Sequence, residues 1–507
     1  MKKNFEEVVL SQYNKYIEEN SKELEKIAIK KKFREGNTGI KLKLMVKCIF
    51  RVFGLKFDMQ LEAFKREENI RQSLEDMHVY TSLKYSSKYN VEDDGRLQTV
   101  LVDNTVNTVP EYTQTRNYEE LIKEKKSYLA LMVENLDIGG LEEVVKLLAL
   151  EYRKRKIDLK IFCTRKGGKI AEELQKAGIE VVVFNGKKRV FEKYIFQNRP
   201  LLINSHYVVD FMDVITKYQI PVVDVIHNMY VFLPEHRLRK ELQKVKVVSE
   251  YIAVSKAAAD IFLNKVMEVD LDKIHVVGNV GRKFENAQIG RKEMRHIYNI
   301  PQDATVFLVA GTIDERKNQL GIVRAWNILK RLTNKKIALV LAGESSGKDY
   351  EKQLRSFIKE WKLEDSVYMI GYCEKIHDLM EASDVLIVNS YYEGWSMAAT
   401  EALYSGLPLI HSNCGSGTEL VADGKNGILI SNPLKDIGKY TAEDLQMCMR
   451  SGRCENIQEL VVAMLKMIQD DECIYNKKDI KSFAKEKYTV NEMINAYLEV
   501  YCKACRI

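Results

Sequence analysis

The stretch from residue 384 to residue 430 constrains the fold of this chain more than any other. Its first apolar run, Val385–Val388, has the length and composition of a buried strand. A polar turn follows and leads into a helix of small residues, which Gly406 and Pro408 end. Another apolar run begins directly afterwards, at 407–411. A strand, a helix and a second strand in this order predict a parallel α/β unit.

Two acidic residues follow the first of these strands. Glu393 stands at the predicted strand end, and Glu401 comes eight residues later, about two helical turns. The spacing predicts that both carboxylates lie on one face of the element. In an open α/β sheet, ligands bind outside the carboxyl ends of the strands. Carboxylates accept hydrogen bonds, so the predicted ligand carries the hydroxyl groups of a sugar or a ribose.

The same alternation of strands and helices runs from about residue 126 to residue 430. Two successive series of strands predict an α/β protein with two doubly wound, Rossmann-like parallel sheets joined near 282–300. An amphipathic helix is predicted at Val490–Cys502. The predicted strands are Tyr128–Val133, Leu159–Cys163, Val181–Phe184, Leu201–Asn204, Val222–Ile226 and Tyr251–Val254, then Val306–Val309, Ile337–Leu341, Val367–Ile370, Val385–Val388, Leu407–His411 and Gly427–Ile430.

The acidic pair, its small-residue helix and the later loop Gly415–Glu419 resemble the Glu-x7-Glu region of a known family. These are the retaining group 1 glycosyltransferases of the GT-B fold, glycosyltransferase family four. The resemblance covers roughly residues 125–505. It implies two Rossmann-like domains facing a cleft. The implied organisation is a mainly helical extension and linker at 1–120, an acceptor-side domain at 121–285, a nucleotide-sugar-binding domain at 286–485, and a helix crossing back to the first domain at 486–507.

The resemblance implies cations for the donor diphosphate in the loop after the first strand of the second domain. The family places a lysine there, and Lys317 matches it. Many members also carry an arginine directly after the glycine that corresponds to Gly311, where this chain has Thr312. Arg316 is therefore expected to supply the second cation. Together they would neutralise charge on the leaving diphosphate.

The other implied site residues stand at strand ends. His227 ends the strand Val222–Ile226 and is expected to position the transferred sugar, and His206 takes an acceptor-side place. Gly139 and Gly140 follow the first strand, where glycines let a phosphate approach a helix N-terminus. Glu393 is expected to hold a hydroxyl of the donor sugar, and the expected donor-binding residues are Gly139, Gly140, Gly311, Glu344, Tyr372, Gly394 and Glu401, the last on the ribose.

The composition excludes several classes of protein. The 507 residues, 46% hydrophobic and 30% charged, are typical of a globular protein, and no apolar run approaches the ~18 residues of a membrane span. Nine scattered cysteines favour reduced thiols and a cytoplasmic location. The zinc motif His-Glu-x-x-His and the P-loop pattern are absent, so we expect no metal and no resident cofactor.

The segment between Lys26 and Lys56 is strongly basic. It holds ten lysines and arginines against one acid, Glu35. Within it, Lys43, Lys47 and Arg51 are four residues apart and form one stripe on a predicted helix whose other side is apolar. This pattern fits a helix lying on an anionic membrane surface. The alternative is a helix packed on the catalytic domains with its lysines in water.

The resemblance implies a nucleotide-diphosphate sugar and a saccharide or lipid-linked acceptor as partners, and no nucleic acid. The implied reaction is retaining transfer of a hexosyl or N-acetylhexosaminyl group in capsule, exopolysaccharide or other envelope glycan synthesis, with metal-independent chemistry. Two alternatives stay open at this point. A sugar-nucleotide epimerase of the same fold would turn over the donor alone, and a non-catalytic protein would bind the nucleotide sugar without turnover.

Overall fold

The computed structural model describes residues 117–507 except 138, 267, 282–286, 423 and 470–474. These residues belong to one compact unit. The basic segment 26–56 and the predicted extension up to residue 116 lie outside the described residues, so the predicted membrane helix stays a prediction.

The first domain is built on a parallel sheet of seven strands within the described part of the chain. The strands are β1 (Leu129–Asn135), β2 (Leu159–Lys166), β3 (Glu180–Val183), β4 (Leu202–His206), β5 (Val222–Ile226), β6 (Glu250–Ala253) and β7 (Ile274–Val276). Their order across the sheet is β3-β2-β1-β4-β5-β6-β7. The helices are α4 (Tyr118–Glu124), α5 (Gly140–Lys154), α6 (Lys169–Lys176), α7 (Lys188–Gln197), α8 (Met212–Lys217), α9 (Glu235–Lys244) and α10 (Lys256–Lys265).

The second domain repeats this plan on six described parallel strands. They are β8 (Thr305–Ala310), β9 (Ile337–Ala342), β10 (Val367–Gly371), β11 (Val385–Val388), β12 (Leu409–Ser412) and β13 (Gly427–Ile430). Their order is β10-β9-β8-β11-β12-β13. The helices are α11 (Arg291–Ile297), α12 (Gln319–Leu332), α13 (Lys348–Glu360), α14 (Ile376–Ala382), α15 (Met397–Tyr404), α16 (Gly417–Leu420), α17 (Ala442–Ser451), α18 (Ile457–Gln469) and α19 (Lys477–Lys487).

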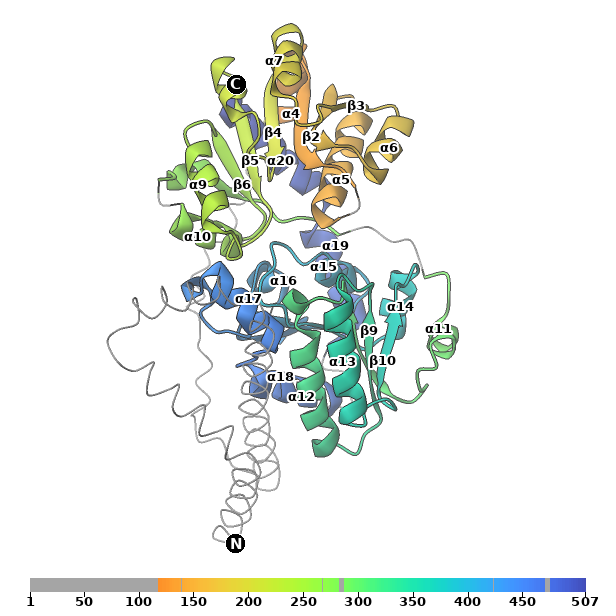
Figure 1. Ribbon diagram of the computed structural model, residues 1–507. Helices are drawn as coiled ribbons and strands as arrows, with labels where there is room; N and C mark the ends of the chain where they lie inside the picture. Colours follow the sequence, from red (N-terminus) through yellow and green to blue (C-terminus); the bar gives the residue numbers. More distant parts are fainter. Residues whose placement is uncertain (1–116, 138, 267, 282–286, 423, 470–474) are drawn as a thin grey trace, which may run out of the picture. The chain divides into compact units, whose positions relative to one another are not determined.

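Helices cover both faces of the second sheet, which explains the uninterrupted apolar runs of its strands. Phe307 and Val309 of β8 pack into the core formed with α12, α13 and α18 (Figure 1). Val306 and Leu308 alternate with them and pack in the other core, with α14 and α15. Each such side chain contributes about 1.5–3 kcal/mol when it is fully buried. The two predicted doubly wound parallel sheets are therefore confirmed.

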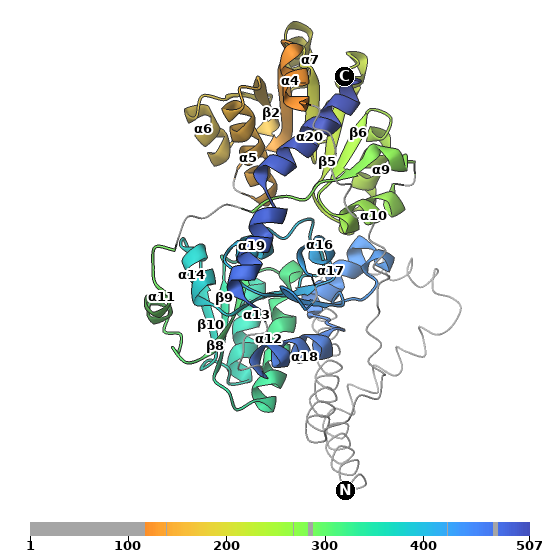
Figure 2. The ribbon, with the colours of Figure 1, turned by 180° about the vertical axis from the view of Figure 1, so that it is seen from behind.

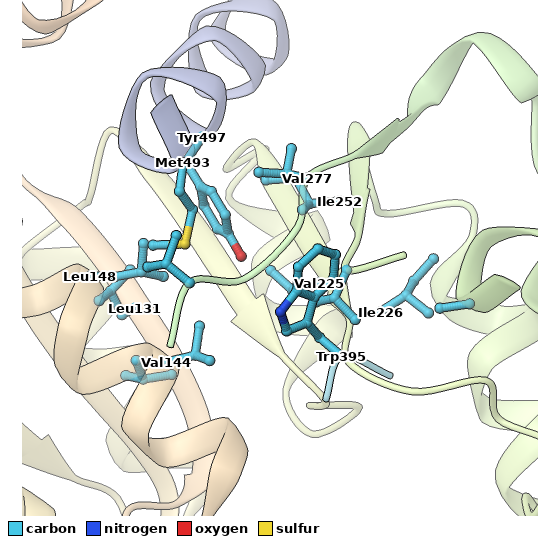
Figure 3. Packing of buried hydrophobic residues seen from close by; sticks show 14 of the residues in the cluster. Leu131, Val144, Leu148, Val225, Ile226, Ile252, Val277, Trp395, Met493 and Tyr497 are labelled. Atoms are coloured by element: carbon cyan, nitrogen blue, oxygen red, sulfur yellow. The ribbon is translucent and has the colours of Figure 1, made fainter. Parts of the chain in front are cut away.

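The last helix, α20 (Val490–Cys505), packs on the first domain although it follows the second in sequence. It contacts α4 and the strands β4, β5 and β6 (Figure 2). Thr489 caps its N-terminus by accepting a hydrogen bond from the backbone of Glu492. Figure 3 shows Met493 and Tyr497 of this helix in the same buried cluster as Leu131 of β1. The C-terminal segment is thus part of the core that supports the first sheet.

Candidate functional site

Each sheet has one point at which its strand order reverses, between β1 and β4 in the first and between β8 and β11 in the second. Open α/β sheets bind ligands at such points, beyond the carboxyl ends of the strands. At the second of them, a small pocket lies between the loops that follow β8 and β11. Gly311, Lys317, Asn389 and Ser390 are among its lining residues.

Three charged side chains meet beside this pocket. Nζ of Lys317 lies 2.5 Å from Oε1 of Glu393, and Nη1 of Arg316 lies 3.0 Å from Oε2 of the same carboxylate. Ser390 donates its hydroxyl to Oε1 at 2.7 Å. Glu393 is only 6% exposed, so water competes little for these hydrogen bonds.

The two cations decide the ionisation of Glu393. Burial alone would raise the pKa of its carboxyl group, but the charges of Lys317 and Arg316 and the hydrogen bonds outweigh burial and hold the pKa at about 2. For Arg316, burial lowers the pKa, and the charges of Glu393 and Asp314 outweigh that effect and raise it. Glu393 is therefore ionised at neutral pH, and it holds Lys317 and Arg316 in place before a ligand arrives.

The loop after β8 fixes Lys317 by backbone contacts. Asp314 accepts a hydrogen bond from the backbone nitrogen of Lys317 at 2.9 Å and caps the short 3-10 helix Glu315–Lys317. Gly311 has φ +142°, a conformation that side chains rarely adopt, and the end of the Lys317 side chain lies over it. Asp314 and Ser390 were not among the predicted site residues. A polar residue three positions before each of Lys317 and Glu393 is the signal that could have indicated them.

The prediction that Glu393 and Glu401 share one face of a helix is wrong. Helix α15 begins at Met397, after Ser396 caps it by accepting a hydrogen bond from the backbone of Ala399. Glu393 lies in the preceding loop, whereas Glu401 is in the helix. The Glu401 side chain instead lies against Gly281, next to the connection between the domains. Glu393 and Glu401 thus belong to different elements, a loop and a helix, and the ribose contact of Glu401 stays a prediction.

The first domain meets this loop at His227. A side chain at Gly394 would lie 1.8 Å from the backbone oxygen of His227, so only glycine permits this close approach. Next to it, Trp395 packs against Gly278 and lies in the same buried cluster as Val225 of β5 (Figure 3). His227 therefore follows β5 directly beside the loop that carries Glu393.

The two predicted histidines contact one another. Nδ1 of His206 lies 2.8 Å from Nε2 of His227, and Nε2 of His206 lies 2.8 Å from Oδ1 of Asn204. Burial lowers the pKa of His227 to about 3. Burial, together with the neighbouring His227, holds the pKa of His206 well below its usual range. His206 is 1% exposed, so the structure places it behind His227, and its acceptor-side role stays a prediction.

The other predicted donor-binding residues lie at three separate strand ends. Gly139 caps α5 and Gly140 begins it; a side chain at Gly140 would meet no atom within 4 Å, whereas one at Gly139 would lie 2.2 Å from Oε2 of Glu142. Glu344 is exposed after β9, with its backbone oxygen accepting from Ile313. Tyr372 follows β10 and is 68% exposed. Their contacts with a ligand stay predictions.

The described residues include neither a cluster of metal-ligand side chains nor a helix that could span a membrane. No three His, Cys, Asp or Glu side chains in this part of the chain are grouped as metal ligands are. Metal-independent chemistry stays a prediction. None of the described helices is both long and apolar enough to span a bilayer.

Comparison with known families identifies both domains. Residues 138–280 match the family model "Glycosyltransferase Family 4", and residues 290–443 match "Glycosyl transferases group 1". The chain is 26% identical to a D-inositol 3-phosphate glycosyltransferase of Paenarthrobacter aurescens, over 58% of this chain and 81% of that protein. It is 23% identical to a poly(glycerol-phosphate) alpha-glucosyltransferase of Bacillus subtilis, over 41% of this chain and 32% of that protein.

Solved structures agree with this assignment at the level of the fold. Anabaena HepE, in complex with UDP and glucose, has a TM-score of 0.59 and 19% identity, covering 74% of this chain and 98% of that one. The lipopolysaccharide outer core galactosyltransferase WaaB has a TM-score of 0.54 and 16% identity, covering 74% and 98%. These likenesses confirm the predicted GT-B fold. The two matched models and the two parallel-sheet domains together show that this chain belongs to the group 1 glycosyltransferases, within glycosyltransferase family four.

Proposed function

We propose that this protein is a retaining glycosyltransferase that moves a sugar from a nucleotide-diphosphate donor to a hydroxyl acceptor without a metal ion. The observation that carries the proposal is the ionised cluster of Lys317, Arg316 and Glu393 at the switch point of the second sheet. A leaving diphosphate gains negative charge as the bond to the sugar breaks. Two preorganised cations at the edge of a pocket stabilise that charge without reorganising in the transition state.

Each member of the cluster has donors or acceptors to spare for the donor substrate. A guanidinium carries five N–H groups and an ammonium three, so both cations can contact a phosphate while they hold Glu393. We propose that Glu393 accepts a hydrogen bond from a hydroxyl of the donor sugar. Its two cation contacts make it a poor nucleophile, which supports attack of the acceptor from the front face. In this front-face mechanism, the leaving phosphate accepts the proton of the attacking hydroxyl group.

The names of relatives guide the choice of substrates. Anabaena HepE was crystallised with UDP and glucose, which supports starting a donor panel with UDP-sugars. The relatives named above act on inositol phosphate and poly(glycerol-phosphate), which supports acceptors that are polyols bearing a phosphate. We propose hexosyl or N-acetylhexosaminyl transfer in capsule, exopolysaccharide or other envelope glycan synthesis as the setting.

The test incubates the full-length protein with each donor, with and without candidate acceptors. We expect nucleotide diphosphate to be released much faster with an acceptor, and mass analysis to find the acceptor heavier by one sugar. Retention requires the anomeric proton of the product to show the configuration of the donor by NMR. Release of diphosphate and an altered sugar from the donor alone would indicate an epimerase. Binding without any turnover would indicate a non-catalytic protein. Loss of transfer in EDTA would contradict metal independence.

We further propose that the basic segment 26–56 attaches the protein to an anionic membrane surface. Lys43, Lys47 and Arg51, which the sequence predicts in one stripe of a helix, would contribute roughly 1 kcal/mol each near such a surface. The full-length protein should sediment with anionic vesicles at low salt and be released at high salt, because salt screens these charges. A protein with the three residues changed to glutamine, and one beginning near residue 120, should stay in the supernatant. Equal sedimentation of all three proteins would overturn the attachment.

A further inference from the structure

A file of buried polar side chains connects the last helix of the chain to His227. Tyr152 of α5 and Tyr501 of α20 have their hydroxyl oxygens 3.0 Å apart, and the Tyr501 hydroxyl lies 2.7 Å from Oδ1 of Asn204 on β4. From Asn204 the file continues through His206 to His227 by two contacts of 2.8 Å. Asn204 and His206 are two residues apart on β4, so the file runs along the face of the sheet that α20 covers, toward the carboxyl edge. Polar groups in such a position are costly unless each is paired.

The direction of each hydrogen bond is fixed by a backbone carbonyl. The side-chain nitrogen Nδ2 of Asn204 donates to the backbone oxygen of Val223 at 3.0 Å, and a carbonyl can only accept. Oδ1 of Asn204 is therefore the atom that faces Tyr501 and His206, and an amide oxygen also only accepts. Tyr501 consequently donates to Asn204. For the same reason Nε2 of His206 carries the hydrogen that it shares with Oδ1.

The protonation of His227 follows from that of His206. A neutral imidazole has one N–H and one bare nitrogen, so Nδ1 of His206 is an acceptor. The hydrogen in its contact with His227 must then sit on Nε2 of His227. The lowered pKa values of both histidines support neutral rings at physiological pH. Nδ1 of His227 is left bare, and among the described residues it has no hydrogen-bond partner.

We propose that Asn204 and His206 are positioning residues that hold His227 in its Nε2–H tautomer, so that Nδ1 of His227 accepts a hydrogen bond from a substrate hydroxyl. The inference rests on the proposed function, because the hydroxyl belongs to the transferred sugar or to its acceptor. His227 lies beside the loop of Glu393 through the contact of its backbone with Gly394. With the opposite tautomer, Nδ1 of His227 would carry an N–H and could not accept. The file of buried polar side chains thereby makes Nδ1 of His227 a hydrogen-bond acceptor.

The tautomers are measurable in the full-length protein without any substrate. Histidine labelled with ¹⁵N, in two-bond proton–nitrogen spectra near pH 8, distinguishes the protonated from the bare ring nitrogen. The eight histidines are assigned by single substitutions. We expect both His206 and His227 to carry the hydrogen on Nε2. A His227 protonated on Nδ1 in the unsubstituted protein would overturn the proposal, whatever the protein catalyses.

Two substitutions of His206 separate positioning from packing. His206→Gln offers an amide oxygen to His227 and an amide nitrogen to Asn204, so the His227 tautomer should be kept. His206→Leu offers neither, so His227 should populate both tautomers and turnover should fall by about tenfold, the equivalent of one neutral hydrogen bond. His206→Gln should restore most of that loss. An unchanged His227 tautomer in folded His206→Leu would contradict the inference, as would a tautomer lost in His206→Gln.

Tyr497→Phe serves as the matched control. Tyr497 is also a buried tyrosine of α20, one turn before Tyr501, but its hydroxyl has no hydrogen-bond partner within the part of the chain that the structure describes. Its removal should change neither the His227 tautomer nor turnover, and a changed tautomer would contradict the specific file. If no donor is turned over at all, the proposed function fails while the tautomer measurement still decides the positioning role.

Discussion

Replacing Lys317 by alanine should lower kcat by about 100- to 1,000-fold, the range found when one preorganised donor to a developing negative charge is removed. The lysine ammonium lies over Gly311 beside the switch-point pocket, and Asp314 fixes its backbone. The charge of a leaving diphosphate grows mainly in the transition state. The loss should therefore appear in kcat more than in the affinity for the donor. Steady-state rates with the best donor and acceptor pair measure it.

Lys330→Ala is the control for this change. Lys330 is in the last turn of α12, whose N-terminus directly follows the Lys317 loop, and it also pairs with a carboxylate, Asp365. Its removal should leave turnover unchanged.

Arg316→Ala should lower kcat about as much as Lys317→Ala, because Arg316 contacts the other oxygen of Glu393. Near-normal turnover in a folded Lys317→Ala protein would contradict the assignment of the diphosphate site.

The strands were predictable because burial on both faces leaves a local signal. Val385–Val388 is apolar throughout and forms β11 with the predicted bounds, since helices cover the sheet on either side. Strand β7 was not predicted. It has three residues, Ile274–Val276, it is at the edge of its sheet, and none of its side chains is fully buried. Such a strand depends on its neighbour β6 more than on its own sequence.

The positions of the charges were less predictable than their identities. The sequence indicated Lys317 and Glu393 as candidates, but their ion pair joins residues 76 positions apart and depends on β8 and β11 being neighbours. The prediction that Glu393 shares a face with Glu401 was wrong for a local reason. Ser396 is a strong N-cap residue, and recognising it would have placed the start of α15 after Glu393. The file of buried polar side chains also depends on the contact of Tyr501 with Asn204, which joins residues 297 positions apart and which no local pattern reveals.

Glu393→Gln should lower turnover by at least about 100-fold while the protein stays folded. The carboxylate accepts from Lys317 and Ser390 on one oxygen and from Arg316 on the other. An amide keeps the shape but turns one of these oxygens into a donor. In either orientation one cation then faces an N–H group and must move. The substitution thus displaces a diphosphate ligand and removes the proposed contact to the donor sugar. Glu401→Gln should mainly raise the KM for the donor.

The same substitution should reduce the free energy of unfolding by about 3 kcal/mol near neutral pH, the low end for breaking a buried pair, because both cations keep some solvent access. The pKa of Glu393 is about 2 in the folded protein, below its value in the unfolded chain. Its stabilisation is therefore complete above the unfolded pKa and is lost as the pH falls toward 2. Urea unfolding measures the free energy of unfolding of the unsubstituted and the Glu393→Gln protein. The difference between the two proteins should be smaller at about pH 4 than at about pH 7.

Glu381→Gln provides the comparison for both effects. Glu381 pairs with Lys481 at 2.7 Å on the partly exposed end of α14, and a pair of this kind contributes about 0–1 kcal/mol. Its turnover should be normal and its stability nearly unchanged. If Glu393→Gln instead behaved like Glu381→Gln, the cluster would be an ordinary surface ion pair. A Glu393→Gln protein with unchanged stability but low turnover would still support the catalytic role. It would show that Glu393 matters for turnover and contributes little to the free energy of unfolding.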